Sequence, residues 1–333
     1  MVNGVSVVVS TYNGGSQLVE VLSCIEHQVF TGNLELIVVD NNSSPETAKI
    51  IEIEINKLTI SARRVKEKKQ GLLFARIKGL YEARYDVVLM VDDDNFLSKN
   101  YVAEVFQAFQ KDDTLGLVGG VGIARFETEK PWWFDHYQSS FAVGPQLKYH
   151  SLYGAGLGIR KNVYLSILEN PNIEHVLVGR TGKTLLSGED SEINFWFKLS
   201  GWKVRALDSI SFEHLMKEDR MNLEFLHRLY HGFGMTRVFT RPYLDYLSNK
   251  ANVIPPPSIL GPLHIKRLSY LEHTLQNLKR EENTIDGQDL NSLSKSLKLS
   301  NLYGEIEMIQ KINWSYRKTL LTIQKNCLAL HNV

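Results

Sequence analysis

The chain has 333 residues, of which 43% are hydrophobic and 23% charged, and its formal net charge is +1. These values are typical of a soluble globular protein, and the balanced charge predicts no nucleic-acid partner. The only two cysteines, Cys24 and Cys327, argue against a disulfide framework and fit a reducing compartment. No run approaches the ~20 apolar residues that a membrane span needs.

The chain begins with a predicted strand and lacks the basic and then apolar pattern of a signal peptide. We therefore expect a cytoplasmic protein that is at most peripheral on the inner face of the membrane. Residues 1–219 hold 23 Lys and Arg against 28 Asp and Glu, whereas residues 220–333 hold 15 against 9. The basic carboxyl-terminal region is a candidate for contact with anionic lipid or with a polyanionic acceptor.

The first part of the chain alternates short apolar strands with segments of helical periodicity. Strands are predicted at Val5–Ser10, Leu34–Asp40, Ile60–Val65, Val87–Val91 and Leu115–Gly122. Helices are predicted at Leu18–Ile25, Glu46–Leu58, Leu72–Arg84 and Asn100–Phe109. This alternation predicts an α/β fold, with a Rossmann-like, mainly parallel sheet and helices on both faces.

Residues 126–187 are irregular and rich in glycine and aromatic residues. They precede a predicted helix at Glu189–Leu199 and two short strands at Lys203–Leu207 and Ile210–Phe212. From residue 221 to residue 333 helical periodicity dominates, and it is interrupted by a proline-rich linker near 251–262. We therefore expect a helical appendage after the sheet.

The last part of this region carries a stripe at heptad spacing. The stripe consists of Leu302, Ile306, Ile309, Asn313, Tyr316, Leu320, Ile323 and Cys327. Together with a shorter stripe of Leu268, Leu271, Leu275 and Leu278, it predicts a two-helix hairpin docked on the body of the protein. A homodimer contact through these helices and a membrane-surface contact are the alternatives.

Three consecutive aspartates, Asp92, Asp93 and Asp94, follow the buried strand at Val87–Val91. Three carboxylates at the end of a buried strand concentrate negative charge, which a divalent cation such as Mg²⁺ or Mn²⁺ would offset. Taken alone, the run is equally well explained as a solvated acidic turn. The strands at Val5–Ser10 and Leu34–Asp40 also end in polar residues, and ligands of such sheets lie at these strand ends.

Five segments occur in a characteristic order: VVVSTYN at 7–13, VVDNNS at 38–43, GLLFAR at 71–76, VDDDN at 91–95 and SGEDSE at 187–192. In this order they resemble the inverting family 2 glycosyltransferases, which have a GT-A fold. The resemblance covers residues 3–235. It implies a catalytic domain at 1–220, with a nucleotide-binding half at 1–125 and an acceptor-binding half at 126–220.

The resemblance places the nucleotide at the first two strand ends. The residues implied are Thr11, Tyr12, Asn13 and Asp40. A carboxylate such as Asp40 can accept a hydrogen bond from a base imide N–H, which uracil and thymine both offer, and a UDP-sugar is the donor we expect; an Asx turn is the structural alternative. Gly71 and Arg76 would pass beside the nucleotide, where Arg76 would either meet a phosphate or pair with an acid.

The acid run matches the family's D-x-D motif. Asp94 would bind Mn²⁺ or Mg²⁺ directly, Asp92 would contact the ribose or the metal through water, and Asp93 would turn toward the protein. His214 would complete the metal shell, although a single histidine is more often structural.

Two basic residues and two acids complete the set implied for the reaction. Lys217 and Arg220 would hold the diphosphate, or they form an ordinary basic face. Asp190 matches the family's base, which deprotonates the acceptor hydroxyl, and Glu189 would touch the acceptor or the donor sugar. The same segment is also typical of a helix start with Ser187 as the N-cap.

Acceptor contacts are predicted in two places outside these motifs. Trp132 and Trp133 form an aromatic cluster that suits a sugar ring and suits a hydrophobic core equally well. Arg180 and Lys183 belong to a glycine-rich basic segment, which would close over the diphosphate or form an ordinary loop.

Together these features predict a metal-dependent inverting glycosyltransferase, either a hexosyl- or an N-acetylhexosaminyltransferase. It would transfer sugar from a nucleotide-diphosphate donor to a saccharide or lipid-linked acceptor, in bacterial surface polysaccharide synthesis. A sugar nucleotidyltransferase is one alternative, but the glycines at 14–15 lack the neighbouring basic residues that it needs. A non-catalytic nucleotide-sugar binding protein is the other, and it would not need Asp190.

Overall fold

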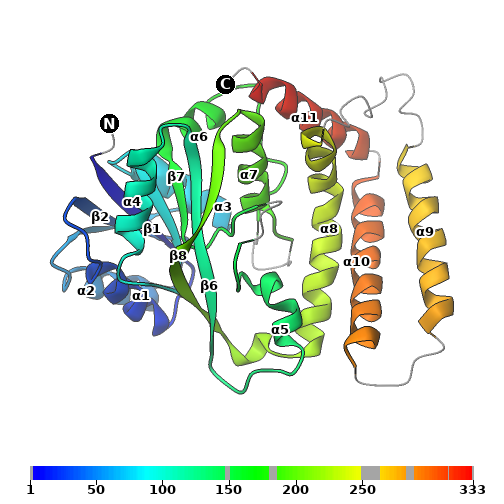
Figure 1. The fold of residues 1–333 in the computed structure, drawn as a ribbon, viewed down its shortest axis with the longest axis horizontal. Helices are drawn as coiled ribbons and strands as arrows, with labels where there is room; N and C mark the ends of the chain where they lie inside the picture. Colours follow the sequence, from blue (N-terminus) through cyan, green and yellow to red (C-terminus); the bar gives the residue numbers. More distant parts are fainter. Residues whose placement is uncertain are drawn as a thin grey trace.

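The computed structural model describes residues 3–146, 151–179, 186–248, 263–282, 289–313 and 315–331. Within these residues an eight-stranded sheet is flanked by helices on both faces, with further helices beyond it (Figure 1). The strands are β1 (Gly4–Thr11), β2 (Asn33–Asp40), β3 (Ser61–Lys66), β4 (Val87–Asp92), β5 (Asn95–Leu97), β6 (Leu115–Phe126), β7 (Leu157–Arg160) and β8 (Lys203–Met216).

The strand order is β3-β2-β1-β4-β7-β6-β8-β5. The first four strands in this order are parallel to one another, and β6 is parallel to β8. The short β7 runs antiparallel between β4 and β6, and β5 runs antiparallel to β8. The predicted mainly parallel sheet is therefore confirmed, and its parallel strands end at one edge.

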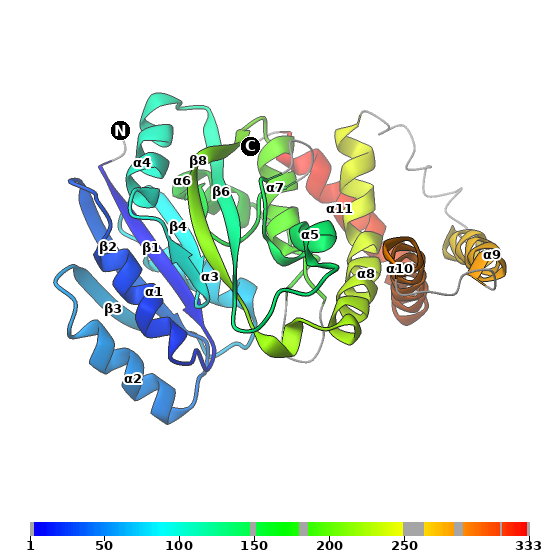
Figure 2. The same ribbon diagram turned by 60° about the horizontal axis from the view of Figure 1, so that its bottom comes forward.

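Apolar residues on both faces of the sheet explain its two helical layers. Val7 and Val9 of β1 pack toward α1 (Gln17–Glu26), α2 (Pro45–Ile55) and α4 (Tyr101–Lys111). Val8, which points to the opposite face, packs toward α3 (Leu72–Glu82), α6 (Lys161–Leu168) and α7 (Glu189–Leu199). Successive side chains of a strand point to opposite faces, so a continuous apolar strand needs cover on both (Figure 2).

The carboxyl-terminal helices are α8 (Leu223–Leu247), α9 (Leu263–Glu282), α10 (Leu290–Ile312) and α11 (Ser315–Leu330). In both views α8 lies beside α7, and α10 separates α8 from α9 (Figures 1 and 2). Met235 of α8, Ile309 of α10 and Cys327 of α11 belong to the same hydrophobic cluster as Val8 of the sheet. The predicted helical appendage is thus confirmed, and it shares a core with the sheet.

The predicted heptad helix is wrong at its centre. Asn313 has φ 30° and ψ −106°, which is not a helical conformation, so α10 ends at Ile312 and α11 begins at Ser315. The polar position in the stripe is therefore the break between two helices. The predicted linker at 251–262 lies outside the described residues.

Two further boundaries differ from the prediction. The strands predicted at 203–207 and 210–212 form the single strand β8, and β6 continues to Phe126. These two long strands pair from Leu115 and Lys203 to Phe126 and Met216, so backbone pairing extends them through polar residues. No helix in the described ranges combines the length and the apolar character needed to cross a membrane.

Candidate active site

A cavity of about 580 Å³ lies where β1 and β4 end, bounded by the start of α7, by residues 139–142 and by α8. Three short segments complete the elements around it: α5 (Phe134–Tyr137) and the 3₁₀ turns η1 (Gln138–Phe141) and η2 (Glu218–Arg220). Most of the predicted site residues line the cavity: Thr11, Tyr12, Gly71, Arg76, Asp92, Asp93, Asp94, Glu189, Asp190, His214 and Arg220. Residues that are far apart in the sequence thus share one space.

The three aspartates point to three different partners. Asp92 ends β4, and its carboxylate accepts a hydrogen bond from Arg76 at 2.8 Å. Asp93 Oδ2 accepts one from Thr11 Oγ1 at 2.6 Å. Asp94 Oδ2 lies 3.6 Å from His214 Nε2 and 3.5 Å from Arg220 Nη1. Asp93 is thus turned toward the protein, which agrees with the sequence prediction.

Burial and neighbouring charge separate the protonation behaviour of Asp93 and Asp94. Burial, with added repulsion from the adjacent aspartates, raises the pKa of Asp93 to about 6. Burial acts in the same direction on Asp94, but His214 and Arg220 outweigh it and lower the pKa of Asp94 to about 2. Asp94 therefore stays ionised well into acid, whereas Asp93 takes up a proton as the pH falls through about 6.

Arg76 joins the acid run to the start of α7. Its buried guanidinium contacts Asp92 with Nη2 and Glu189 Oε1 with Nη1, the latter at 3.3 Å. Burial opposes its charge, but Asp92 and Glu189 more than compensate and raise the pKa of Arg76. In this structure Arg76 therefore pairs with acids, which is one of the two roles that the sequence left open.

The predicted base Asp190 lies in the first turn of α7. Its Oδ2 accepts a hydrogen bond from the Gly154 N–H at 3.2 Å, and its Oδ1 accepts one from the Ser191 N–H at 2.7 Å. Its carboxylate is therefore held at the cavity wall by two backbone donors. The predicted N-cap was wrong: Gly188, not Ser187, caps α7, and its φ of 114° favours glycine.

His214 lies within β8 rather than at its end, and it pairs with Asn95 of β5. Its Nδ1 donates to the Phe141 carbonyl at 2.7 Å, since a carbonyl oxygen can only accept. Nε2 is thereby directed toward Asp94. Burial disfavours the charged ring, but Asp94 and the Phe141 carbonyl outweigh it and raise the pKa of His214.

Two predicted donor residues, Asp40 and Asn13, do not line the cavity. Asp40 is fully buried, and its carboxylate accepts hydrogen bonds from the Ser43 N–H at 2.8 Å and from Arg64 Nη2 at 2.6 Å. Asn13, with φ 52°, accepts a hydrogen bond from the Ser44 N–H through Oδ1 at 2.8 Å. Both residues brace the loops after β1 and β2, and their predicted contact with a base stays a prediction.

The remaining predicted residues lie away from the cavity wall. Lys217 is close enough to Asp93 and Asp94 to lower the pKa of both, although it does not line the cavity. Trp133 is buried against Phe134 and Phe141, whereas Trp132 is 54% exposed. Arg180 and Lys183 lie outside the described residues.

The sequence reasoning missed one wall of the cavity. Phe225, Leu229 and Phe233 line it from one face of α8, and Thr236 Oγ1 donates to the Ser187 carbonyl at 2.6 Å. Their four-residue spacing marks a helix face, but spacing alone does not distinguish a core-facing stripe from a cavity wall. Asn41 was also missed. Its Oδ1 accepts a hydrogen bond from the Gly71 N–H, and its Nδ2 donates to the Lys69 carbonyl.

The donor set at Asp94 fits a divalent cation that is shared with a phosphate ligand. Within the described residues no group of three or more His, Cys, Asp or Glu side chains forms a complete metal cluster. Mg²⁺ and Mn²⁺ in such sites are often held by one or two protein ligands together with phosphate oxygens and water. Asp94 and Nε2 of His214 provide two such ligands on one side of the cavity.

Comparison with known protein families agrees with this geometry. The profile described as glycosyl transferase family 2 matches residues 6–167, which include β1, β4 and the acid run. These residues, just under half of the chain, thus match glycosyl transferase family 2. The match includes the ends of β1 and β4, which line the cavity, and it stops before Asp190 and His214.

Proteins similar to this chain include a glycosyltransferase and a polysaccharide synthase. The chain is 30% identical over 121 residues to glycosyltransferase GlyG of Streptococcus pneumoniae. This match covers 34% of this chain and 38% of the relative. The chain is 25% identical over 233 residues to chondroitin synthase of Escherichia coli. This match covers 69% of this chain and 32% of the relative. The matches thus span about a third of the length of these relatives.

A solved structure shares the fold over nearly the whole chain. It is a mannosyltransferase from Pyrobaculum calidifontis in complex with GDP-Man and Mn²⁺. The TM-score is 0.54 at 17% identity, and the match covers 98% of this chain and 87% of the other. The predicted GT-A fold is confirmed by this likeness.

Proposed function

We propose that the protein is a metal-dependent inverting glycosyltransferase that uses a nucleotide-diphosphate sugar, with a UDP-sugar as the first choice. One observation carries the proposal: Asp94 and Asp190 line one cavity at the carboxyl ends of β1 and β4. The fold neighbour, solved with GDP-Man and Mn²⁺, supports a nucleotide-sugar donor and a divalent cation.

In this proposal the donor lies along the polar end of the cavity. Thr11, Tyr12 and Gly71 line this end, where they would contact the nucleotide, and Arg220 would lie near the diphosphate. A bound divalent cation supplies Lewis-acid stabilisation of charge on the leaving diphosphate. Asp94 and His214 would hold that cation.

Asp190 supplies the base. An acceptor hydroxyl gives its proton to Asp190 while its oxygen forms a bond to the anomeric carbon, and the bond from that carbon to the diphosphate breaks. The diphosphate leaves with the electron pair. Because attack comes from the face opposite the leaving group, the configuration at the anomeric carbon inverts.

The acceptor would lie between Asp190 and the apolar wall of α8. Phe141 and Phe225 are stacked with ring centroids 6.2 Å apart, and Phe233 continues the wall. Such surfaces suit the C–H face of a sugar ring. We expect Phe233→Ala to raise the acceptor KM and to leave UDP binding unchanged.

The central test is Asp190→Asn in the full chain. It keeps the shape of the side chain and removes its basicity, so we expect turnover to fall by about 10² to 10⁴-fold while UDP binding persists. Transfer is measured as nucleoside diphosphate released from a panel of UDP- and GDP-sugars. Asp208→Asn, at an exposed position, is the control; full turnover by Asp190→Asn would refute the catalytic assignment.

The metal is tested separately by calorimetry with UDP. Asp94→Ala should abolish the Mn²⁺-dependent part of the binding enthalpy, since it removes the ionised ligand of the site. If the unmodified protein binds UDP equally tightly with and without Mn²⁺, the metal proposal is refuted, and the fold assignment is unaffected.

A further inference from the structure

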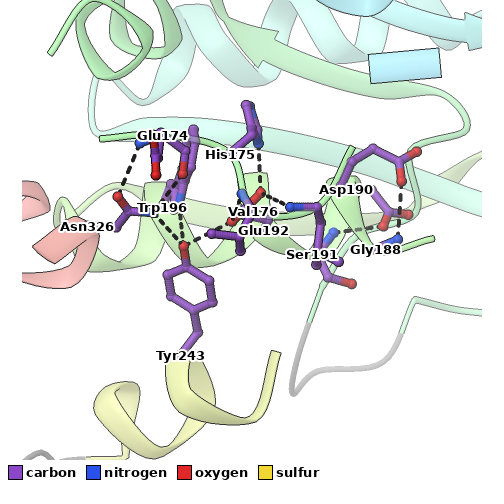
Figure 3. A network of polar contacts seen from close by, with 12 residues as sticks. Glu174, His175, Val176, Gly188, Asp190, Ser191, Glu192, Trp196, Tyr243 and Asn326 are labelled. Atoms are coloured by element: carbon purple, nitrogen blue, oxygen red, sulfur yellow. Dashed lines mark hydrogen bonds and ion pairs between the residues drawn. The ribbon is translucent and has the colours of Figure 1, made fainter. Parts of the chain in front are cut away.

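A second cluster of polar side chains joins α7 to α8 and α11 (Figure 3), and its members Glu192, Tyr243 and Asn326 do not line the cavity. Its centre is Glu192, which is 0% exposed and lies two residues after Asp190. The carboxylate accepts four hydrogen bonds: from His175 Nδ1 at 2.7 Å, Val176 N–H at 3.1 Å, Leu177 N–H at 3.2 Å and Tyr243 OH at 3.0 Å. A buried carboxylate is costly unless its oxygens are satisfied, and here both are.

Tyr243 carries the network from α7 to two other helices. Its hydroxyl donates to Glu192 and accepts from Trp196 Nε1 at 3.1 Å and from Asn326 Nδ2 at 2.9 Å. One donor and two acceptor positions are all that a tyrosine hydroxyl offers, so it is saturated. Tyr243 belongs to α8 and Asn326 to α11.

Asn326 closes the network onto the segment that also bonds Glu192. It accepts a hydrogen bond from the Glu174 N–H at 3.1 Å and donates to the Glu174 carbonyl at 2.8 Å. The next residue, His175, also lies against Trp196, with ring centroids 4.1 Å apart. We call Glu192, Tyr243, Asn326 and His175 the Glu192 network.

The Glu192 network and the proposed base occupy the same short helix. Glu189 and Glu192 are one turn apart, so both lie on the side of α7 that faces the protein, where Glu189 meets Arg76. Glu192 does not line the cavity. It can act on the reaction only through the position of α7, and a base displaced by about 1 Å can cost ~10²-fold in rate.

We propose that Glu192, Tyr243 and Asn326 are positioning residues that fix the first turn of α7, and with it Asp190, against α8 and α11. The carboxyl-terminal helices then belong to the catalytic apparatus and are more than an appendage. The expected effect on rate rests on the proposed function, whereas the expected effect on the position of α7 does not.

The test is Tyr243→Phe, which removes one oxygen atom and leaves Glu192, Trp196 and Asn326 each short of a partner. The matched control is Tyr246→Phe, one turn further along α8, where the described residues show no hydrogen bond to the hydroxyl. Glu192→Gln is the second variant, because it keeps the shape of the side chain while an amide replaces one acceptor oxygen with a donor. All are compared well below their melting temperatures.

Hydrogen exchange is read first, because it needs no substrate. We expect amides of residues 189–195 to exchange at least tenfold faster in Tyr243→Phe and Glu192→Gln than in Tyr246→Phe. Unchanged protection of α7 in both variants would overturn the inference whether or not the protein is an enzyme.

Turnover is read second, as UDP released from the active donor. We expect kcat to fall by about 10 to 10²-fold with little change in donor KM, since the donor end of the cavity is built from β1 and β4. Wild-type kcat in both variants would overturn the positioning role. Absence of turnover from every donor by the unmodified protein would count against the proposed function alone, because the exchange result stands without it.

Discussion

Tyr101 shows how much one buried hydroxyl does in this fold. The side chain is 0% exposed, and its hydroxyl donates to the Gly156 carbonyl at 2.7 Å and accepts from the Gly120 N–H at 2.9 Å. It thereby satisfies two backbone groups, on β6 and on the turn before β7, that would otherwise be buried without partners.

We predict that Tyr101→Phe destabilises the protein by about 1–3 kcal/mol, because two buried backbone groups lose their partner. The free energy of unfolding is measured by urea denaturation. Tyr81→Phe is the control, since Tyr81 is 52% exposed. Equal stability of the two variants would contradict the role given to Tyr101.

Asp40 makes the stability depend on pH. Burial alone would raise the pKa of Asp40, but the Ser43 N–H and Arg64 outweigh it and lower the pKa. The unfolded chain then binds this proton more readily than the folded one, so the contribution of Asp40 is present above about pH 4 and lost as the pH falls further.

We therefore predict that the difference in unfolding free energy between the wild type and Asp40→Asn shrinks as the pH falls from about 5 to 3. Chemical denaturation at several pH values measures it. Asp208→Asn, at an exposed carboxylate, should show no such trend. A difference that stays constant across this range would show that the pKa of Asp40 does not change on folding.

At the scale of elements, α8 and α10 cross at two glycines. A Cβ atom on Gly304 would lie 1.9 Å from the His231 carbonyl oxygen, and one on Gly234 would lie 1.8 Å from that of Asn301. Both distances are far below van der Waals contact and involve backbone atoms, which cannot rotate away. The close crossing of these helices therefore depends on glycine at both positions.

We predict that Gly304→Ala lowers the free energy of unfolding by about 1–3 kcal/mol, because the two helices must separate to admit the methyl group. The midpoint of urea denaturation measures the loss. Tyr303→Ala, at the 41% exposed neighbour on the same helix, should change it by much less. Tolerance of Gly304→Ala would mean that α10 does not need this close approach.

At the scale of the whole molecule, one hydrophobic cluster runs from the sheet to the last helix. It contains Val8 of β1, Trp196 of α7, Ile309 of α10 and Cys327 of α11. The boundary predicted at residue 220 therefore does not divide the core.

We predict a single unfolding transition, with helix content, tryptophan fluorescence and thiol labelling of Cys327 changing together. A Cys24→Ser background leaves Cys327, which is 1% exposed, as the thiol that is labelled. Loss of helix content and exposure of Cys327 at a lower temperature than the change in the sheet would show an independently folding helical region.

The predictability of the site differed from residue to residue. The acid run was predictable because it follows directly on a buried strand, and Asp190 and His214 were predicted through the resemblance to family 2. The wall of α8 was not, since Phe225 and Phe233 line the cavity only through the packing of α8 on α7. Glu192 looked like one more acid in a helix start, because the donors that surround it lie as far away as residues 175 and 243.

The sequence by itself determined the alternation of strands and helices, the parallel sheet and the identity of the acids at its edge. These follow from local periodicity and from the rule that parallel strands end at one edge. Only the tertiary structure decided which partner each aspartate has, that Asn313 breaks a helix, and that α8 and α11 support α7. Such facts depend on contacts between residues that are distant in the chain, and the free energy of those contacts is not encoded in any local pattern.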